Sequence, residues 1–122
     1  MPRLFVYGSL RRGQANHSLL AGARLLGLAA TLPRYTLLDL GAFPALIEGG
    51  TTSVEGEIFE VPDSLLPLLD QLEEHPRVYE RKNIQLAGEP PAQAYVLPQR
   101  LRRGARELTA GRWPPSPIGG KS

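Results

Sequence analysis

The chain has 122 residues, 42% of them hydrophobic and 21% charged, which is the composition of a folded domain rather than of a disordered segment. Its net charge is +2, and it contains no cysteine. The absence of cysteine excludes disulfides, cysteine-ligated metal centres and thiol nucleophiles, so any catalysis must use oxygen or nitrogen groups.

The first expected element is a strand over residues 4–7, a β-type run that ends in a tight Gly-Ser loop. Residues 16–21 are expected to form a short helix with Asn16 near its cap. The apolar run 25–32 stops at a proline and indicates a second strand. Loops such as the first one often carry functional groups, because a rigid scaffold positions them at the surface.

The rest of the chain continues as short strands separated by turns that contain glycine and proline. These strands are expected at 35–40, 45–47, 54–61, 79–86 and 93–97. Gly56 indicates a bulge or a close approach of the backbone. Residues 100–111 are expected to add one or two helical turns. We expect a single domain over residues 1–113, followed by an extended Pro/Gly-rich tail over residues 114–122.

The clearest helix is expected over residues 65–74, where leucines recur at the spacing of one helical face. These leucines are Leu65, Leu68, Leu69 and Leu72. Ser64 is the expected N-cap, and Pro67 falls in the first turn, where a missing N–H costs least. Pro76 prevents the helix from continuing.

Glu73 is the candidate catalytic residue of this helix. On a helical wheel it lies beside the leucine stripe, whereas Asp70 and Glu74 fall on the solvent side. A carboxyl group half-buried against leucines is expected to have a pKa above its ordinary value of about 4.3, which suits proton transfer near neutral pH. A structural ion pair between Glu73 and Arg77 or Arg81 accounts for the helical wheel equally well.

Two stretches together resemble the γ-glutamylcyclotransferase family. They are Phe5-Val6-Tyr7-Gly8-Ser9-Leu10, and Leu69-Asp70-Gln71-Leu72-Glu73 followed by Pro76, Tyr79 and Arg81. Further matches are Arg12-Gly13, Asn16-His17, Val54-Glu55-Gly56-Glu57 and Gly111-Arg112-Trp113. Neither of the short motifs is specific alone, but their ordered occurrence covers nearly the whole chain.

The resemblance implies an α+β fold, built as a small, mixed, partly closed β-barrel with a few short helices. It also implies that a γ-glutamyl amino acid or amine is converted to 5-oxoproline, with release of the amino acid or amine. In that reaction the α-amine of the glutamyl group attacks its own γ-carbonyl carbon, without cofactor or metal. The alternative is a catalytically inactive sensor of the same fold that binds a small ligand.

The resemblance and the chemistry together assign roles to six residues. Glu73 takes a proton from the substrate amine and delivers it to the leaving amine. The backbone N–H groups of Gly8, Ser9 and Leu10 are expected to bind the anionic groups of the substrate, although an ordinary turn has the same sequence. Tyr7 and Tyr79 are expected to hold the glutamyl chain folded, and for Tyr79 a core position with an exposed hydroxyl is an equal alternative.

Position 74 departs from the family pattern. Many family members have glycine directly after the catalytic glutamate, whereas this chain has Glu74. We expect the second carboxylate to raise the pKa of Glu73 further, because like charges disfavour ionisation.

Other partners are not expected. His17 and His75 are two lone histidines, which are usually surface or capping residues, so no metal site is expected. The five arginines of residues 1–38 are scattered, so nucleic-acid binding is only a third hypothesis, based on the basic ends. No apolar run approaches the roughly 20 residues of a membrane span, and we expect a cytoplasmic protein. The sequence carries no signal for the oligomeric state.

Overall fold

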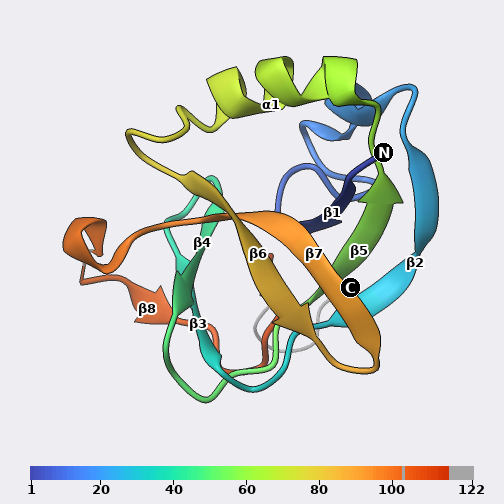
Figure 1. Ribbon diagram of the computed structural model, residues 1–122. Coiled ribbons are helices and arrows are strands. Elements are labelled where there is room, and N and C mark those ends of the chain that lie inside the picture. Colours follow the sequence, from blue (N-terminus) through green and yellow to red (C-terminus); the bar gives the residue numbers. More distant parts are fainter. Residues whose placement is uncertain (103, 116–122) are drawn as a thin grey trace.

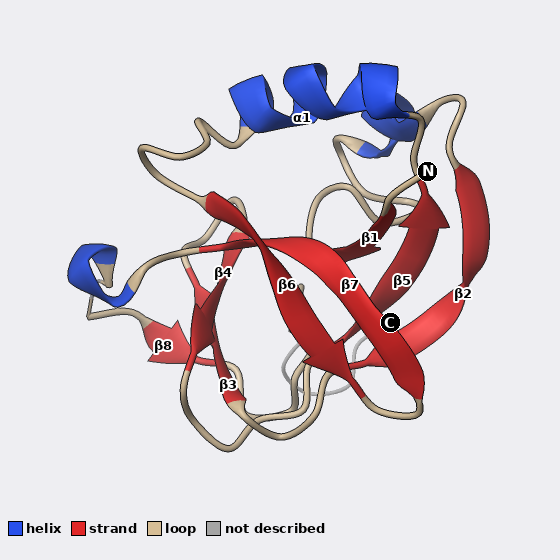
Figure 2. Cartoon of the chain, viewed as in Figure 1, coloured by secondary structure: helices blue, strands red, loops and turns tan. Residues whose placement is uncertain are grey.

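The computed structural model describes residues 1–102 and 104–115, in which one curled sheet carries a single short α-helix at one end (Figures 1 and 2). The strands are β1 (Arg3–Val6), β2 (Arg24–Ala30), β3 (Tyr35–Asp39), β4 (Pro44–Glu48), β5 (Glu55–Glu60), β6 (Glu80–Leu86), β7 (Glu89–Val96) and β8 (Arg106–Glu107). The helix is α1 (Leu66–Leu72), and the 3-10 turns are η1 (His17–Leu20), η2 (Asp63–Leu65) and η3 (Gln99–Leu101). The strand-rich prediction is confirmed.

The sheet has the order β2-β5-β1-β7-β4-β3-β8, and β6 pairs with β7 outside this path. Most neighbours are antiparallel, but β7 runs parallel to both β1 and β4, so the sheet is mixed. The end of β2 also reaches β6, because the Leu32 N–H donates to the Gln85 carbonyl (3.1 Å) and the Ala87 N–H to that of Ala30 (2.9 Å). The sheet therefore curls until its first edge meets β6, which gives a partly closed barrel.

The central strand β1 is buried on both of its faces. Successive side chains of a strand point to opposite sides, and Phe5 belongs to one hydrophobic cluster whereas Leu4 and Val6 belong to the other. The second cluster also contains Leu69 of α1, so the helix covers that side of the sheet. This explains why the three residues of β1 that follow Arg3 are all apolar.

Helix α1 is shorter than predicted, and its buried face is different. Leu69 is fully buried, whereas Leu68 and Leu72 are 58% and 40% exposed. Leu65 and Leu66 pack partly buried on the same cluster as Leu69, so the buried face is centred nearer to Glu73 than the leucine spacing indicates. The prediction of Ser64 as N-cap is wrong, because the chain turns earlier as η2 and Leu65 takes that position.

The short helix predicted over residues 16–21 is present as the 3-10 turn η1, and Asn16 stands at its N-cap position. Its side chain makes no capping hydrogen bond, and its amide donates to Ser9 instead. One further prediction is corrected. Residues 100–111 do not form the predicted helical turns: the described part of this segment contains the end of η3 and then β8, which pairs with β3. The predicted tail lies outside the described residues apart from Pro114 and Pro115.

No helix in the described part of the chain combines the length and the hydropathy needed to cross a membrane.

Candidate active site

A cavity of about 320 Å³ lies where the loop after β1 meets the C-terminal end of α1. All six residues that the sequence analysis selects line it: Tyr7, Gly8, Ser9, Leu10, Glu73 and Tyr79. They come from segments about 60 residues apart in the chain, which the packing of α1 against the sheet brings together.

Glu73 stands at the C-terminal cap of α1, one residue after the last helical turn. Its side chain makes no hydrogen bond or ion pair with any residue of 1–102 or 104–115. Burial raises the pKa of its carboxyl group from 4.5 to about 7, because a charged group loses hydration that no partner replaces. Near neutral pH this carboxyl group can therefore both accept and donate a proton.

The arginines considered as partners of Glu73 pair elsewhere. Arg81 binds Asp70, and Arg77 lies 3.8 Å from the Glu74 carboxylate on the surface. The alternative hypothesis, a structural ion pair of Glu73 with Arg77 or Arg81, is therefore wrong.

The expected contribution of Glu74 to the pKa of Glu73 is also absent, since burial alone accounts for the shift. Glu74 is solvent-exposed, and its φ of 54° lies in the left-handed region. Glycine adopts this conformation without steric cost. A backbone requirement thus gives a physical reason for glycine at this position.

The loop after β1 presents a row of free donors. The backbone N–H groups of Gly8, Ser9 and Leu10 donate to no acceptor among the described residues, and all three residues line the cavity. Gly8 is needed for close approach rather than for a left-handed φ, because an added Cβ would lie 2.7 Å from the Pro44 ring. Successive unpaired N–H groups at a cavity can bind an anion.

Side chains on either side hold this loop in place. Asn16 donates from its amide to the Ser9 hydroxyl (2.9 Å) and from its backbone N–H to the Ser9 carbonyl (2.8 Å). On the other side, the buried carboxylate of Glu57 accepts from the backbone N–H (2.9 Å) and the Nε (3.0 Å) of Arg12. The loop geometry is therefore fixed before any ligand binds, which favours a preorganised site.

Both predicted tyrosines are buried and have their hydroxyls engaged. Tyr7 donates to the Tyr95 carbonyl (2.6 Å) and accepts from the Leu46 N–H (3.1 Å). Tyr79 donates to the Pro44 carbonyl (2.9 Å), so its hydroxyl is not exposed. Burial raises the pKa of both phenols above the ordinary value of 10, so both stay neutral at physiological pH and provide rigid walls.

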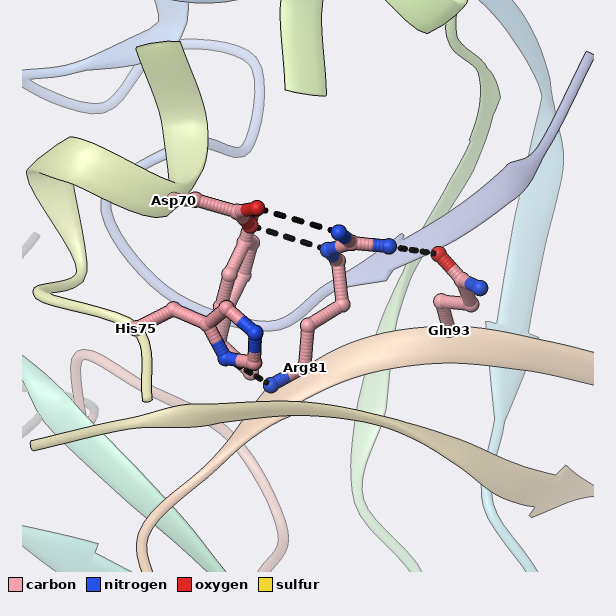
Figure 3. Close-up of polar contacts among 5 residues, drawn as sticks. Asp70, His75, Arg81 and Gln93 are labelled. Carbon is pink, nitrogen blue, oxygen red and sulfur yellow. Dashed lines mark hydrogen bonds and ion pairs between the residues drawn. The ribbon is translucent and has the colours of Figure 1, made fainter. Parts of the chain in front are cut away.

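A polar network holds the end of α1 on the sheet (Figure 3). The guanidinium of Arg81 donates to both carboxylate oxygens of Asp70 (2.8 and 3.0 Å) and to the Gln93 side chain (2.9 Å). Tyr95, which lines the cavity, donates its hydroxyl to the same Asp70 (2.7 Å). The hydrogen bond from Arg81 is the main cause that lowers the pKa of Asp70. Asp70 is thus a half-buried anchor and not the solvent-side residue expected.

Several lining residues could not be selected from the sequence. Phe43, Pro44 and Tyr95 line the cavity, yet they come from turns and strands whose spacing in the chain carries no sign of convergence. Asn16 also lines the cavity, and its signal in the sequence is the motif Asn16-His17, which the resemblance includes without a role for the side chain. Among residues 1–102 and 104–115, no group of three or more His, Asp or Glu could hold a metal ion.

Comparison with known proteins gives a consistent relationship. Residues 4–115 match the family model described as "Gamma-glutamyl cyclotransferase, AIG2-like". The chain is 35% identical over 112 residues to the gamma-glutamylcyclotransferase family protein YtfP of Escherichia coli K12, which covers 91% of this chain and 95% of that protein. A protein of Vibrio cholerae serotype O1 is 48% identical over 82 residues, which is 67% of this chain and 70% of that protein.

Solved structures share the architecture. The crystal structure of a uropathogenic E. coli-specific protein has a TM-score of 0.79 at 28% identity, covering 92% of this chain and 91% of that chain. The crystal structure of an AIG2-like protein from Mus musculus has a TM-score of 0.72 at 31% identity, covering 79% and 76%. The family model spans almost the whole described chain, and the chain belongs to the AIG2-like γ-glutamylcyclotransferase family.

Proposed function

We propose that the protein is an enzyme that converts a γ-glutamyl amino acid or amine to 5-oxoproline, with Glu73 as its acid and base. The α-amine of the glutamyl group attacks the γ-carbonyl carbon, and the bond to the leaving nitrogen then breaks. The observation that carries the proposal is a partly buried carboxyl group, unpaired among the described residues, that lines the same cavity as three free backbone N–H groups. The reaction proposed needs neither metal nor cofactor.

The raised pKa of Glu73 suits the proton transfers of this reaction. A substrate α-amine has an ordinary pKa of about 8 and is protonated at pH 7. Its proton transfer to a carboxylate of pKa about 4.3 would cost about 5 kcal/mol. With the pKa of Glu73 at about 7, the same transfer costs about 1.4 kcal/mol. The protonated Glu73 can then deliver its proton to the leaving nitrogen.

The loop after β1 supplies the electrostatic part of the proposal. The N–H groups of Gly8, Ser9 and Leu10 bind the α-carboxylate or the developing oxyanion of the substrate. Because Asn16 already holds this loop, the donors do not reorganise during the reaction. Tyr7 and Tyr79 keep the flexible glutamyl chain folded, and such pre-orientation of an intramolecular attack can be worth about 7–11 kcal/mol.

The direct test measures 5-oxoproline release from a panel of γ-glutamyl amino acids, γ-glutamyl amines and glutathione. Glu73→Gln is expected to lower turnover by about 10²–10⁴-fold, the usual contribution of a general acid–base group, and to bind ligand with nearly unchanged affinity. Glu74→Gln is the matched control, because it removes an adjacent but exposed carboxylate. Full activity of Glu73→Gln would refute the role of this residue.

A binding measurement on the same panel separates an enzyme from a sensor. If no compound releases 5-oxoproline but several raise the melting temperature of the protein, the chain is a ligand-binding module of this family. A steep dependence of RNA or DNA binding on salt concentration would instead support a nucleic-acid partner.

A further inference from the structure

The residues that line the cavity differ strongly in exposure between its inner part and its mouth. Most inner lining residues, including Tyr7, Gly8 and Tyr79, are buried. The exposed lining residues are Phe43, Leu72 and Glu74. Phe43 is 48% and Leu72 is 40% exposed, so two large apolar side chains border the opening.

These two side chains come from separate parts of the fold and meet at the same opening. Phe43 lies in the turn between β3 and β4, and Leu72 is the last residue of α1. Val78, partly buried just before β6, is a further apolar lining residue of the cavity. Ligand sites are commonly lined by apolar groups with a few polar groups that fix orientation, and this opening has that composition.

The charged residues that line the cavity also favour an apolar group at the mouth. Its described lining contains the carboxylates of Glu73 and Glu74 but no lysine, arginine or histidine. A group that extends from the reacting centre to the mouth therefore meets apolar side chains and no cationic partner. The free N–H groups that could hold an anion belong to the loop after β1.

We infer that Phe43 and Leu72 determine the specificity for the leaving group and favour an apolar, uncharged one, an alkyl or aryl amine. The inference rests on the proposed function. The glutamyl part occupies the buried end, where Glu73 serves both nitrogen atoms. The leaving group is then the part of the substrate that reaches the mouth and contacts Phe43 and Leu72.

The inference is tested with γ-glutamyl amides of equal charge that differ only in the amine. The kcat/KM for release of 5-oxoproline is measured for γ-glutamyl methylamide, butylamide and phenethylamide. Contact of three additional methylene groups with the half-exposed mouth is expected to raise kcat/KM for the butylamide by about tenfold over the methylamide.

Three serine variants locate the preference. Leu72→Ser and Phe43→Ser are each expected to reduce the ratio of butylamide to methylamide to about threefold, because each removes part of the apolar contact. Leu68→Ser is the matched control, since Leu68 is an exposed leucine of the same helix that does not line the cavity. It is expected to keep the wild-type ratio.

The outcomes separate this inference from the proposed function. Equal kcat/KM values for all three amides, or a wild-type ratio in both mouth variants, overturn the inference and leave the cyclisation intact. If neither these amides nor the γ-glutamyl amino acids release 5-oxoproline, the proposed function fails, and calorimetric Kd values for the same amides decide the inference. Tighter binding of the butylamide that is lost in Leu72→Ser supports it, whereas equal affinities or no binding refute it.

Discussion

Asp70 and Glu73 are carboxylates three residues apart at the end of the same helix, yet their environments have opposite effects. Asp70 accepts hydrogen bonds from Arg81 and Tyr95, which lower its pKa. Glu73 has no partner in the described structure, and burial raises its pKa to about 7. Asp70 loses less hydration and gains donors that favour its ionised form, whereas Glu73 loses more hydration and gains no donor. The anchored carboxylate holds the helix, and the unpaired one is available for chemistry.

Removing the anchored charge is expected to have the largest effect on stability. Asp70→Asn loses the two-pronged interaction with Arg81 and leaves that half-buried cation unpaired, so we expect a loss of about 3 kcal/mol in the free energy of unfolding. Urea titration at pH 7 measures it. Asp63→Asn, at an exposed position, is the control and should change stability by about 0.5 kcal/mol or less. Equal losses in both variants would contradict the anchoring role.

Removing the unpaired charge of Glu73 is expected to raise the free energy of unfolding near neutral pH, whereas removing the charge of Asp70 lowers it. The raised pKa means that the folded state binds the Glu73 proton more tightly than the unfolded state, so wild-type stability falls as pH rises towards 7. Between pH 5 and 7.5 the wild type should lose about 2 kcal/mol relative to Glu73→Gln. Urea titrations of both proteins at each pH measure this. Glu74→Gln is the control and should show the pH dependence of the wild type. If it instead behaves like Glu73→Gln, the effect does not come from Glu73.

The same pKa should appear in the kinetics. If Glu73 is the base, kcat/KM for 5-oxoproline release should fall about tenfold for each pH unit below about 7, because only ionised Glu73 accepts the amine proton. Above about pH 8 the rate should fall again, since no acid remains to protonate the leaving nitrogen. An acidic limb at pH 4–5 would show that the catalytic carboxylate is not the buried one.

The smallest expected effect concerns the residue that follows Glu73. Glu74→Gly should stabilise the fold by about 1 kcal/mol, because it relieves a non-glycine residue at φ 54°. Glu74→Ala removes the same charge and keeps the backbone cost, so it should not gain this stability. The Glu74–Arg77 pair is exposed and contributes little. Equal stabilities of the two variants, from thermal unfolding, would contradict the backbone explanation.

The sequence selects Glu73 and five other residues of the cavity, but not Phe43, Pro44 and Tyr95, which line it as well. The helical repeat and the two motifs are local signals in the sequence. The family resemblance adds the fold, in which Glu73 and Gly8 line one cavity. The partner of Asp70 is eleven residues away on another element, and helical periodicity cannot indicate it. The leucine spacing misplaced the buried face, because Leu72 borders an opening instead of filling the core.

The groups of the loop after β1 that can bind an anion are backbone N–H groups and not side chains. Any amino acid other than proline supplies an N–H at positions 9 and 10, so replacement of those side chains leaves the donors in place. Position 8 has no such freedom, because a methyl group there would collide with Pro44. Substitution at Gly8 should therefore be tolerated least. At the next two positions the donors survive a substitution, but their placement depends on the Ser9 hydroxyl, which accepts from Asn16, and on the Leu10 side chain, which is buried in the core.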